Sequence, residues 1–417
     1  MLAQIKNSKR YPWIVVALLW VVALLNYLDR QMLATMKTAM QVDIVELQSA
    51  TMFGYLMGIF LWVYGLVNPL SGIIADKVNR KWLIVGSLFV WSAVTFAMGY
   101  ATTFNQLYWL RAIMGVSEAL YMPAGLSLIA DFHSNKSRSL AIGIHMTGLY
   151  FGQALGGFGA TIAAQYSWHA TFHSFGFIGV AYSVVLILFL KDTKRNPDSE
   201  PDPFQQKQIK ISFFSGLKIL FTNIYFWLIL FCFAVPSLPG WATKNWLPTL
   251  FAEKLSLDIA IAGPLATLTI AASSFAGVIF GGILSDRWVQ KSIRGRVYTS
   301  AIGLLLMIPA LLLIGFGQSL VFIVLAGCCF GIGFGMFDAN NMPILYQFIS
   351  PKMRATAYGI MNMTGIFAGA MVTDFLGRST DAGNLGRDFA MLAGIVLIAF
   401  IIQTTFLRPK KRLPVSQ

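Results

Sequence analysis

The sequence predicts an all-α membrane protein with twelve transmembrane helices, and two properties of the chain carry this prediction. Of its 417 residues, 57% are apolar and only 12% are charged, whereas soluble domains carry about 25% charged residues. The apolar residues also gather in runs of about 20, the length at which a helix spans a bilayer. A soluble globular enzyme is therefore the first class of protein to be excluded.

Apolar runs between polar breaks give the expected helices in chain order. The spans predicted for the first half are 12–36, 50–75, 82–101, 105–130, 138–164 and 170–190. Those predicted for the second half are 220–247, 260–285, 297–316, 320–347, 353–376 and 387–407. The polar connection 191–219, which has mixed charge and three prolines in its first part, cannot bury a core of its own. We expect it to link a six-helix half at 1–190 to a second one at 220–417.

The basic residues predict the orientation of these helices. With the amino terminus in the cytoplasm, 24 of the 31 basic residues lie on the cytoplasmic side, three lie outside and four lie within spans. This bias places both termini in the cytoplasm. The net charge of +14 then follows from topology and from attraction to anionic lipid, so we expect membrane lipids rather than nucleic acid as partners.

The cysteines and the amino-terminal residues argue against cysteine-based sites and against a signal peptide. Cys232, Cys328 and Cys329 all lie inside apolar runs, which predicts helix packing rather than a disulfide framework or a zinc site. The first apolar run continues past Asp29 and Arg30 without a small-residue cleavage site, so no removable signal peptide is expected.

One pattern occurs at the same place in both halves. After the second span the sequence reads GIIADKVNRK from Gly72, and after the eighth it reads GILSDRWVQK from Gly282. In each copy an aspartate follows the glycine by four residues, and basic residues follow in the short loop. Internal repeats of this kind are typical of transporters, whose substrate site lies near the middle of the membrane between the repeats. The alternative is two unrelated basic loops that obey the positive-inside rule.

These loops resemble the GxxxDxxxR(K) signature of the major facilitator superfamily, and the layout of two six-helix halves covers the whole chain. The second copy is looser, because Lys291 is followed by SIRGR rather than by a compact basic run. The resemblance implies that the loop residues belong to a cytoplasmic latch between helices. The gating candidates are Asp76, Arg80, Asp286 and Arg287.

A few ionisable residues interrupt the apolar spans. The first span contains Asp29 and Arg30, and the fourth contains Arg111, Gly115 and Glu118 on one helix face. Such groups are costly in the bilayer unless paired or hydrated, and they mark substrate pathways or proton relays. Carboxyl groups can take up and release protons there, whereas arginine stays charged and its planar fork suits a carboxylate. The set therefore predicts an anionic substrate that moves with protons. The alternative is two internal ion pairs, one in each span, that only lock helices together.

Tyr27-x-Asp29-Arg30 together with the fourth-span pattern RxxxGxxE also resembles the anion:cation symporter family, which includes bacterial sugar-acid permeases. The resemblance implies that Tyr27 and Arg30 contact the organic anion. It further implies that Asp29 and Glu118 are protonation sites and that Arg111 interacts with Glu118 during the transport cycle.

Other positions extend this resemblance or depart from it. Asn362 in the eleventh span is a candidate for hydrogen bonding substrate hydroxyls, as in sugar-acid permeases. The family's bacterial members have a substrate-binding glutamine in the fifth span, where this chain has Leu149; Gln153, one turn later, is the candidate replacement. Four further polar residues keep open roles: Lys37, His145, Lys244 and Asp338.

These observations together predict a secondary active transporter that carries a small organic anion, a sugar acid such as an aldonate or hexuronate, with protons by alternating access. We expect a monomer in the bacterial inner membrane that uses the proton as coupling ion and no other cofactor. The chain shows no nucleophile, metal cluster or phosphate loop at workable spacing, which argues against an enzyme. The competing interpretations are an organophosphate antiporter, a Spinster-like lipid exporter and a membrane receptor that does not transport its ligand.

Overall fold

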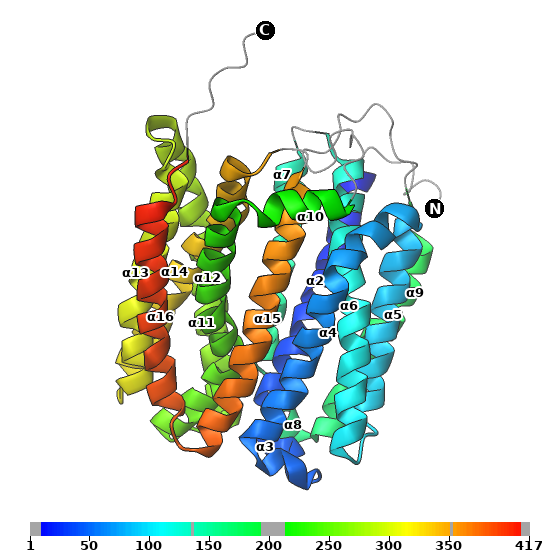
Figure 1. Cartoon of the computed structure of the whole chain (residues 1–417). Helices are drawn as coiled ribbons and strands as arrows, with labels where there is room; N and C mark the ends of the chain where they lie inside the picture. The colour runs from blue at the N-terminus through cyan, green and yellow to red at the C-terminus, as the bar shows by residue number, and fades with distance from the viewer. Residues whose placement is uncertain (1–9, 135–136, 193–212, 351–352, 410–417) are drawn as a thin grey trace. The chain divides into compact units, whose positions relative to one another are not determined.

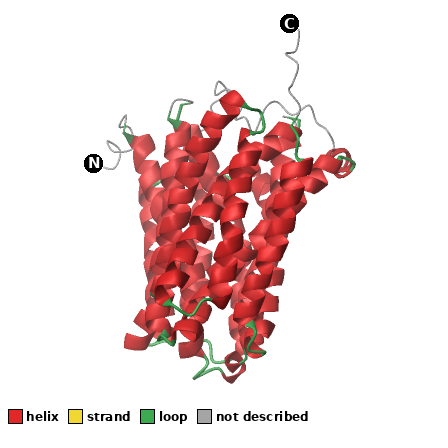
Figure 2. Cartoon of the chain, turned by 90° about the vertical axis from the view of Figure 1, so that its left-hand side faces the viewer, coloured by secondary structure: helices red, strands yellow, loops and turns green. Residues whose placement is uncertain are grey.

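The computed structural model describes residues 10–134, 137–192, 213–350 and 353–409. These residues form helices joined by loops, with no strand among them (Figure 2). The prediction of an all-helical protein is therefore confirmed. The expected linker, 191–219, lies largely outside the described residues.

Apart from the connection between Phe189 and Phe213, the helices follow one another along the chain with short connections (Figure 1). The elements before the linker are α2 (Tyr11–Thr35), α3 (Lys37–Met40), the 3-10 helix η1 (Val45–Gln48), α4 (Ala50–Lys77), α5 (Arg80–Met98), α6 (Phe104–Phe132), α7 (Arg138–Gly156), α8 (Gly159–Gln165) and α9 (Trp168–Phe189). Those after it are α10 (Phe213–Phe221), α11 (Ile224–Leu255), α12 (Ile259–Lys291), α13 (Gly295–Phe316), α14 (Leu320–Phe348), α15 (Arg354–Asp381) and α16 (Leu385–Phe406).

The described residues pack into two compact units. The first unit combines the helices before the linker with two later segments, Trp241–Ala271 and Gly369–Leu385. The second unit contains the rest of the described chain. Because α11, α12 and α15 each contribute to both units, the packing units differ from the two sequence halves, and the division of the chain at the linker stays a prediction.

Eleven of the described helices are long and apolar enough to cross a membrane. The fifth predicted span, 138–164, is instead divided into α7 and α8 by a break at Gly157 and Phe158. α7 also contains polar residues, His145 and Gln153 among them, and it is not one of these eleven helices. The predicted boundaries of the fourth span, 105–130, agree with α6 to within two residues.

Three glycines fix the contact between α2 and α7. They recur every fourth residue on α7, so they share one face of the helix. A Cβ atom added at Gly148 would lie 2.6 Å from the Trp20 carbonyl oxygen, and one at Gly156 would lie 2.7 Å from the Leu28 oxygen. At Gly152, between them, it would collide with an α2 carbonyl oxygen as well. The absence of side chains on this face therefore allows the two backbones to touch, as small residues do in membrane helix pairs.

The start of α6 and its contact with α4 place the charged residues of the fourth span. A capping box starts α6: the Thr103 hydroxyl accepts from Gln106 N–H at 3.4 Å, and the Gln106 side chain accepts from Thr103 N–H at 3.3 Å. About three turns later, a Cβ atom at Gly115 would lie 2.7 Å from the Phe60 carbonyl oxygen of α4. Gly115 therefore allows α4 and α6 to approach each other closely.

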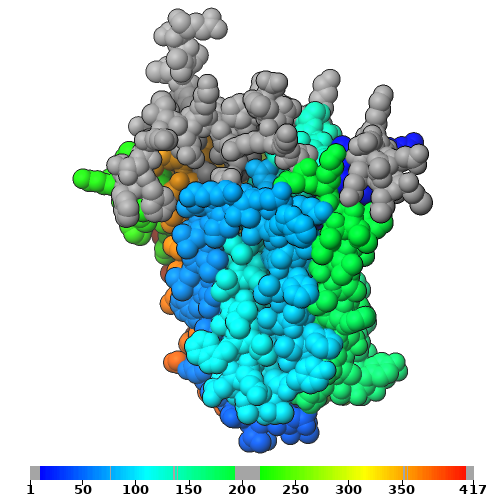
Figure 3. Space-filling model, turned by 90° about the vertical axis from the view of Figure 1, so that its right-hand side faces the viewer, coloured from blue at the N-terminus to red at the C-terminus, as the bar shows by residue number. Residues whose placement is uncertain are grey.

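In the space-filling view, the blue and cyan side chains of α4, α5 and α6 form a continuous surface on one face of the first unit (Figure 3). Behind it, the ionic side chains of α2 and α6 are buried: Asp29 and Arg111 are each 3% exposed and Glu118 is 0% exposed. These groups therefore face the interior of the unit rather than lipid.

Candidate functional site

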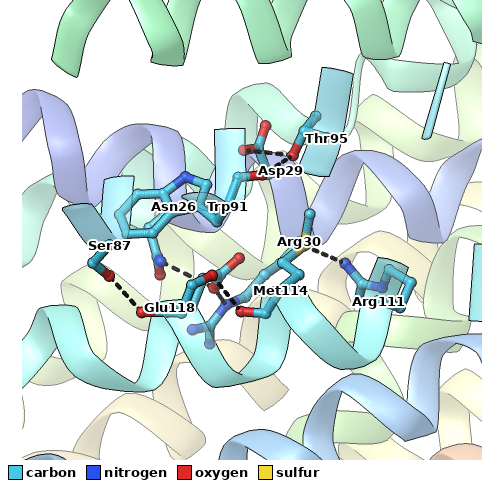
Figure 4. A network of polar contacts seen from close by, with 10 residues as sticks. Asn26, Asp29, Arg30, Ser87, Trp91, Thr95, Arg111, Met114 and Glu118 are labelled. Carbon is cyan, nitrogen blue, oxygen red and sulfur yellow. Dashed lines mark hydrogen bonds and ion pairs between the residues drawn. The ribbon is translucent and has the colours of Figure 1, made fainter. Parts of the chain in front are cut away.

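The site is built on α2 and α6, where Glu118 accepts two hydrogen bonds from α2 (Figure 4). Arg30 Nε donates to Glu118 Oε2 at 2.5 Å, and Asn26 Nδ2 donates to the same oxygen at 2.9 Å. Asn26 and Arg30 are four residues apart, so they lie on one face of α2. The carboxylate is thus held by one guanidinium and one amide, and an ion pair links the first and fourth spans.

Aromatic rings surround the guanidinium group of Arg30. Its Cζ lies 5.1 Å from the ring centroid of Tyr27, 4.8 Å from that of Phe60 and 4.6 Å from that of Tyr64. Such contacts attract a cation through the ring quadrupole, and they strengthen when the cation is removed from water. Phe60 and Tyr64 are four residues apart on α4, which explains how one helix face supplies both rings.

Arg111 shares the Phe60 ring with Arg30, since its Cζ lies 4.6 Å from the same centroid. Its Nη1 atom lies 3.0 Å from the Met114 sulfur, a weak acceptor one turn later on α6. Arg111 also interacts electrostatically with Glu118, Arg30 and Asp29. All four ionic side chains that the sequence selected therefore lie together in one compact unit.

Asp29 points in a different direction from Arg30. Thr95 of α5 donates its hydroxyl to Asp29 Oδ2 at 3.3 Å, away from the Glu118 cluster (Figure 4). Consecutive residues of a helix are turned by about 100° from each other, so their side chains leave the helix in different directions. The structure thus differs from the alternative of two pairs within single spans: the ion pair joins Arg30 to Glu118, on two helices.

Several buried polar atoms at this site make no hydrogen bond within the described residues. They include both donors and acceptors: Asn26 Oδ1, Asp29 Oδ1, Arg30 Nη2, Arg111 Nε and Glu118 Oε1. Buried polar groups in native proteins are nearly always hydrogen bonded, and exceptions call for an explanation. Unpaired guanidinium donors are suited to an anion, and unpaired carboxylate oxygens can accept protons. Among the described residues, no three His, Cys, Asp or Glu side chains are grouped as a metal ion would require.

The other substrate-binding candidates make no hydrogen bond to this network among the described residues. Gln153 is buried in α7, next to the glycine face that contacts α2. Asn362 is half-buried in α15, in the part of that helix that belongs to the second unit. Their predicted contacts with substrate stay predictions.

The gating candidates make two separate ion pairs. Arg80, the first residue of α5, pairs with Asp131 near the end of α6. In the second copy of the motif, Asp286 lies 3.6 Å from Arg296 Nη2, across the turn between α12 and α13. Arg287 is exposed. Asp76 lies in the last turn of α4, and its side chain is outside the described part of the structure.

Sequence reasoning missed a contact between α4 and α15, two helices that are far apart in the sequence. Asp381, the last residue of α15, accepts hydrogen bonds from the Ser49 hydroxyl at 2.7 Å and from the N–H groups of Ala50 at 2.7 Å and Thr51 at 2.9 Å. The first N–H groups of a helix have no partner within it, so Asp381 caps α4 from another helix. The glycines of α4, four residues apart at 54 and 58 and both close to α15, were the available sequence signal.

The residues with open roles are also placed by the structure. Lys37 begins α3, after the first span has ended, and half-burial lowers the pKa of its ammonium group. His145 is fully buried in α7, with its ring 6.0 Å from that of Tyr121. Lys244 on α11 lies close to Tyr27 of α2, and it is considered further below.

Comparison with known proteins agrees with this architecture. A model of the Major Facilitator Superfamily matches residues 19–373. The sodium-dependent phosphate transport protein 1, chloroplastic, of Arabidopsis thaliana is 25% identical over 412 residues, which cover 94% of this chain and 78% of the relative. A probable galactarate/D-glucarate transporter of Bacillus subtilis (strain 168) is 25% identical over 429 residues, which cover 95% of this chain and 91% of the relative.

Among solved structures, a bacterial homologue of the human lysosomal transporter Spinster, in an inward-facing and unoccupied conformation, has the same fold. Its TM-score is 0.81 at 20% sequence identity, with 97% of this chain and 100% of that chain covered. The resemblance predicted from the two loop motifs and the charged spans is thus confirmed. The chain is a multi-pass membrane transporter, not an enzyme, and it belongs to the Major Facilitator Superfamily.

Proposed function

We propose that this transporter carries a small organic anion, a sugar acid, into the cell together with protons by alternating access. The observation that supports this most directly is the Arg30–Glu118 pair. Arg30 uses Nε for the carboxylate and keeps Nη2 without a hydrogen bond among the described residues. The substrate carboxylate and Glu118 would thus use the same buried guanidinium, so protonation of one can control binding of the other.

The proposed cycle follows from this competition. A proton first occupies Glu118 or Asp29, which removes a negative charge that competes for Arg30. The substrate carboxylate then pairs with Arg30, whose planar group can bind a carboxylate through two N–H donors. Loss of the proton to the cytoplasm restores the Arg30–Glu118 pair and releases the substrate. Arg111, close to both acids, would favour the return of negative charge.

The relatives support the substrate class. The chain is similar along nearly its whole length to a probable galactarate/D-glucarate transporter of Bacillus subtilis. We place the protein in a bacterial inner membrane with both termini in the cytoplasm, because the basic residues cluster in the loops on that side. The proton is the coupling ion in this proposal, and the transporting unit is the monomer.

Exchange in proteoliposomes tests the coupling. Glu118→Gln keeps the size and hydrogen-bonding capacity of the side chain but cannot be ionised. This variant should retain exchange of labelled sugar acid across the membrane and lose uptake driven by a pH gradient. The matched control is Glu46→Gln, the same change at an exposed residue of η1, which should keep both activities. Unchanged gradient-driven uptake by the Glu118 variant would refute the proposal.

The main alternatives are an organophosphate antiporter and a lipid exporter. Two buried arginines at one aromatic ring could also hold a phosphate group, and one relative is a phosphate transport protein. Counterflow assays with sugar acids, sugar phosphates and lysolipids separate the three. Accumulation of label only with sugar acids would support the proposal. Accumulation only with sugar phosphates or only with lysolipids would refute it and support the corresponding alternative.

A further inference from the structure

A second cation lies beside the tyrosine that flanks Arg30. Lys244 on α11 has its ammonium nitrogen 5.7 Å from the Tyr27 ring centroid and 4.8 Å from that of Trp241. The Arg30 guanidinium carbon lies 5.1 Å from the same Tyr27 centroid. The two cations are therefore at most about 11 Å apart, and both lie near the Tyr27 ring.

The surroundings hold this lysine close to α2. Gln31, next to Arg30 on α2, donates its side-chain amide to the Lys244 carbonyl oxygen at 2.7 Å. Trp241 is packed so tightly against α15 that a Cβ atom at Gly369 would collide with its indole ring. The backbone of α11 and the ring that contacts the ammonium group are thus both fixed, and all of these residues belong to the first unit.

The balance of charges at this site favours a substrate with two negative charges. Three cations, Arg30, Arg111 and Lys244, accompany two carboxylates, Asp29 and Glu118. With both carboxylates ionised, one positive charge is in excess, and with one of them protonated the excess is two. A cation within the membrane is costly unless an anion or a polar group compensates it. Summed over these five groups, a doubly charged substrate would balance the charge of the proton-loaded site, whereas a singly charged substrate would balance half of it.

We propose that Lys244 binds the second carboxylate of a dicarboxylate sugar acid, whose first carboxylate is bound by Arg30. This inference rests on the proposed function and narrows its substrate class from sugar acids in general to aldarates. The two cations are close enough for one six-carbon diacid to reach both. Both cations lie near the Tyr27 ring, which would then contact the hydroxylated carbon chain of the diacid. Lys244 is then the residue that selects a diacid over the corresponding monoacid.

Galactarate and D-galactonate are matched probes for this selection. They share one carbon skeleton and differ only at the terminal carbon, which is a carboxylate in galactarate and an alcohol in galactonate. Affinities are measured on purified full-length protein by equilibrium binding of each labelled compound. We expect the wild type to bind galactarate at least roughly tenfold more tightly than galactonate, since a charged hydrogen-bonded contact contributes about 1.5–3 kcal/mol.

Three variants test whether Lys244 causes the preference for galactarate over galactonate. Lys244→Gln should reduce the ratio of the galactarate and galactonate affinities by roughly 10- to 100-fold. Lys244→Arg keeps the charge and should restore most of that ratio. Lys218→Gln, the same change at an exposed residue of α10, is the control and should leave the ratio unchanged. A merely structural role for Lys244 would weaken both compounds equally and leave the ratio in place.

The outcomes separate the two proposals. Binding of both compounds by the wild type, with a ratio that Lys244→Gln does not change, would overturn the role of Lys244 and leave sugar-acid transport standing. A wild type that prefers galactonate would also overturn it. Binding of neither compound would reject the proposed function itself, and this inference with it.

Discussion

Removal of the Asp381 carboxylate should weaken the attachment of α15 to the start of α4. Asp381→Ala deletes the acceptor of three hydrogen bonds, two of them from N–H groups in the first turn of α4. A helix cap contributes about 1 kcal/mol, and a negative charge at a helix N-terminus contributes about 0.3–1 kcal/mol more. Because Asp381 is exposed, we take about 1 kcal/mol in total, which is a factor of roughly five in an equilibrium constant.

This factor is measurable as a change in population. If the protein alternates as proposed, conformations in which α15 has left α4 should become roughly fivefold more populated. Spin labels at Val45 and Ala382, both exposed, report the distance across this contact by double electron–electron resonance. The three native cysteines are first replaced by serine. Asp381→Asn, which keeps an acceptor oxygen but no charge, should give an intermediate population.

Asp258 supplies the control for this experiment. It caps its own helix, α12, by accepting from Ala260 N–H at 2.7 Å, so Asp258→Ala removes a cap without separating α15 from α4. The label distances in this variant should match those of the parent. If Asp381→Ala also leaves the distances unchanged, or if both variants change them alike, then the contact does not hold the two helices together.

Two further predictions concern packing and the aromatic ring between the arginines. Gly152→Ala should lower the free energy of unfolding by about 1–3 kcal/mol, because the added methyl group collides with α2. Gly143→Ala on the same helix, where a Cβ atom meets nothing within 4 Å, should lower this free energy far less. Thermal unfolding in detergent compares the two variants. Phe60→Leu should destabilise the protein by about 1 kcal/mol more than Phe251→Leu, since both rings are buried but only Phe60 contacts two guanidinium groups. Equal losses would show that the ring contributes only apolar burial.

Helix spacing made part of the site predictable from the sequence. The interval between Arg111 and Glu118 placed both on one face of the fourth span, and their charge marked them within an apolar run. The glycine between them, Gly115, was expected on the same face, and the structure shows that α4 approaches closely there. Local periodicity therefore identified the residues and the sides of the helices on which they lie.

The partners of these residues could not be predicted, because partner choice depends on how helices are rotated and packed. Arg30 and Asp29 are adjacent in sequence, yet one faces Glu118 and the other faces Thr95. Lys244 lies more than 200 residues from Tyr27 and meets it only through the packing of α11 on α2. Contacts of this range leave no periodic signal in a single sequence.

The three glycines of α7 that contact α2, Gly148, Gly152 and Gly156, determine how a bound substrate would move with these two helices. The backbone of α7 lies directly against α2 at three successive turns, and the glycines at these turns contribute no side chain that could absorb a shift. Close-packed contacts of this kind transmit displacement rather than deform. Arg30 on one helix and Gln153 on the other must then travel as parts of one rigid pair. In a substrate bound by both residues, the distance between the two contacts would therefore stay constant while the other helices move.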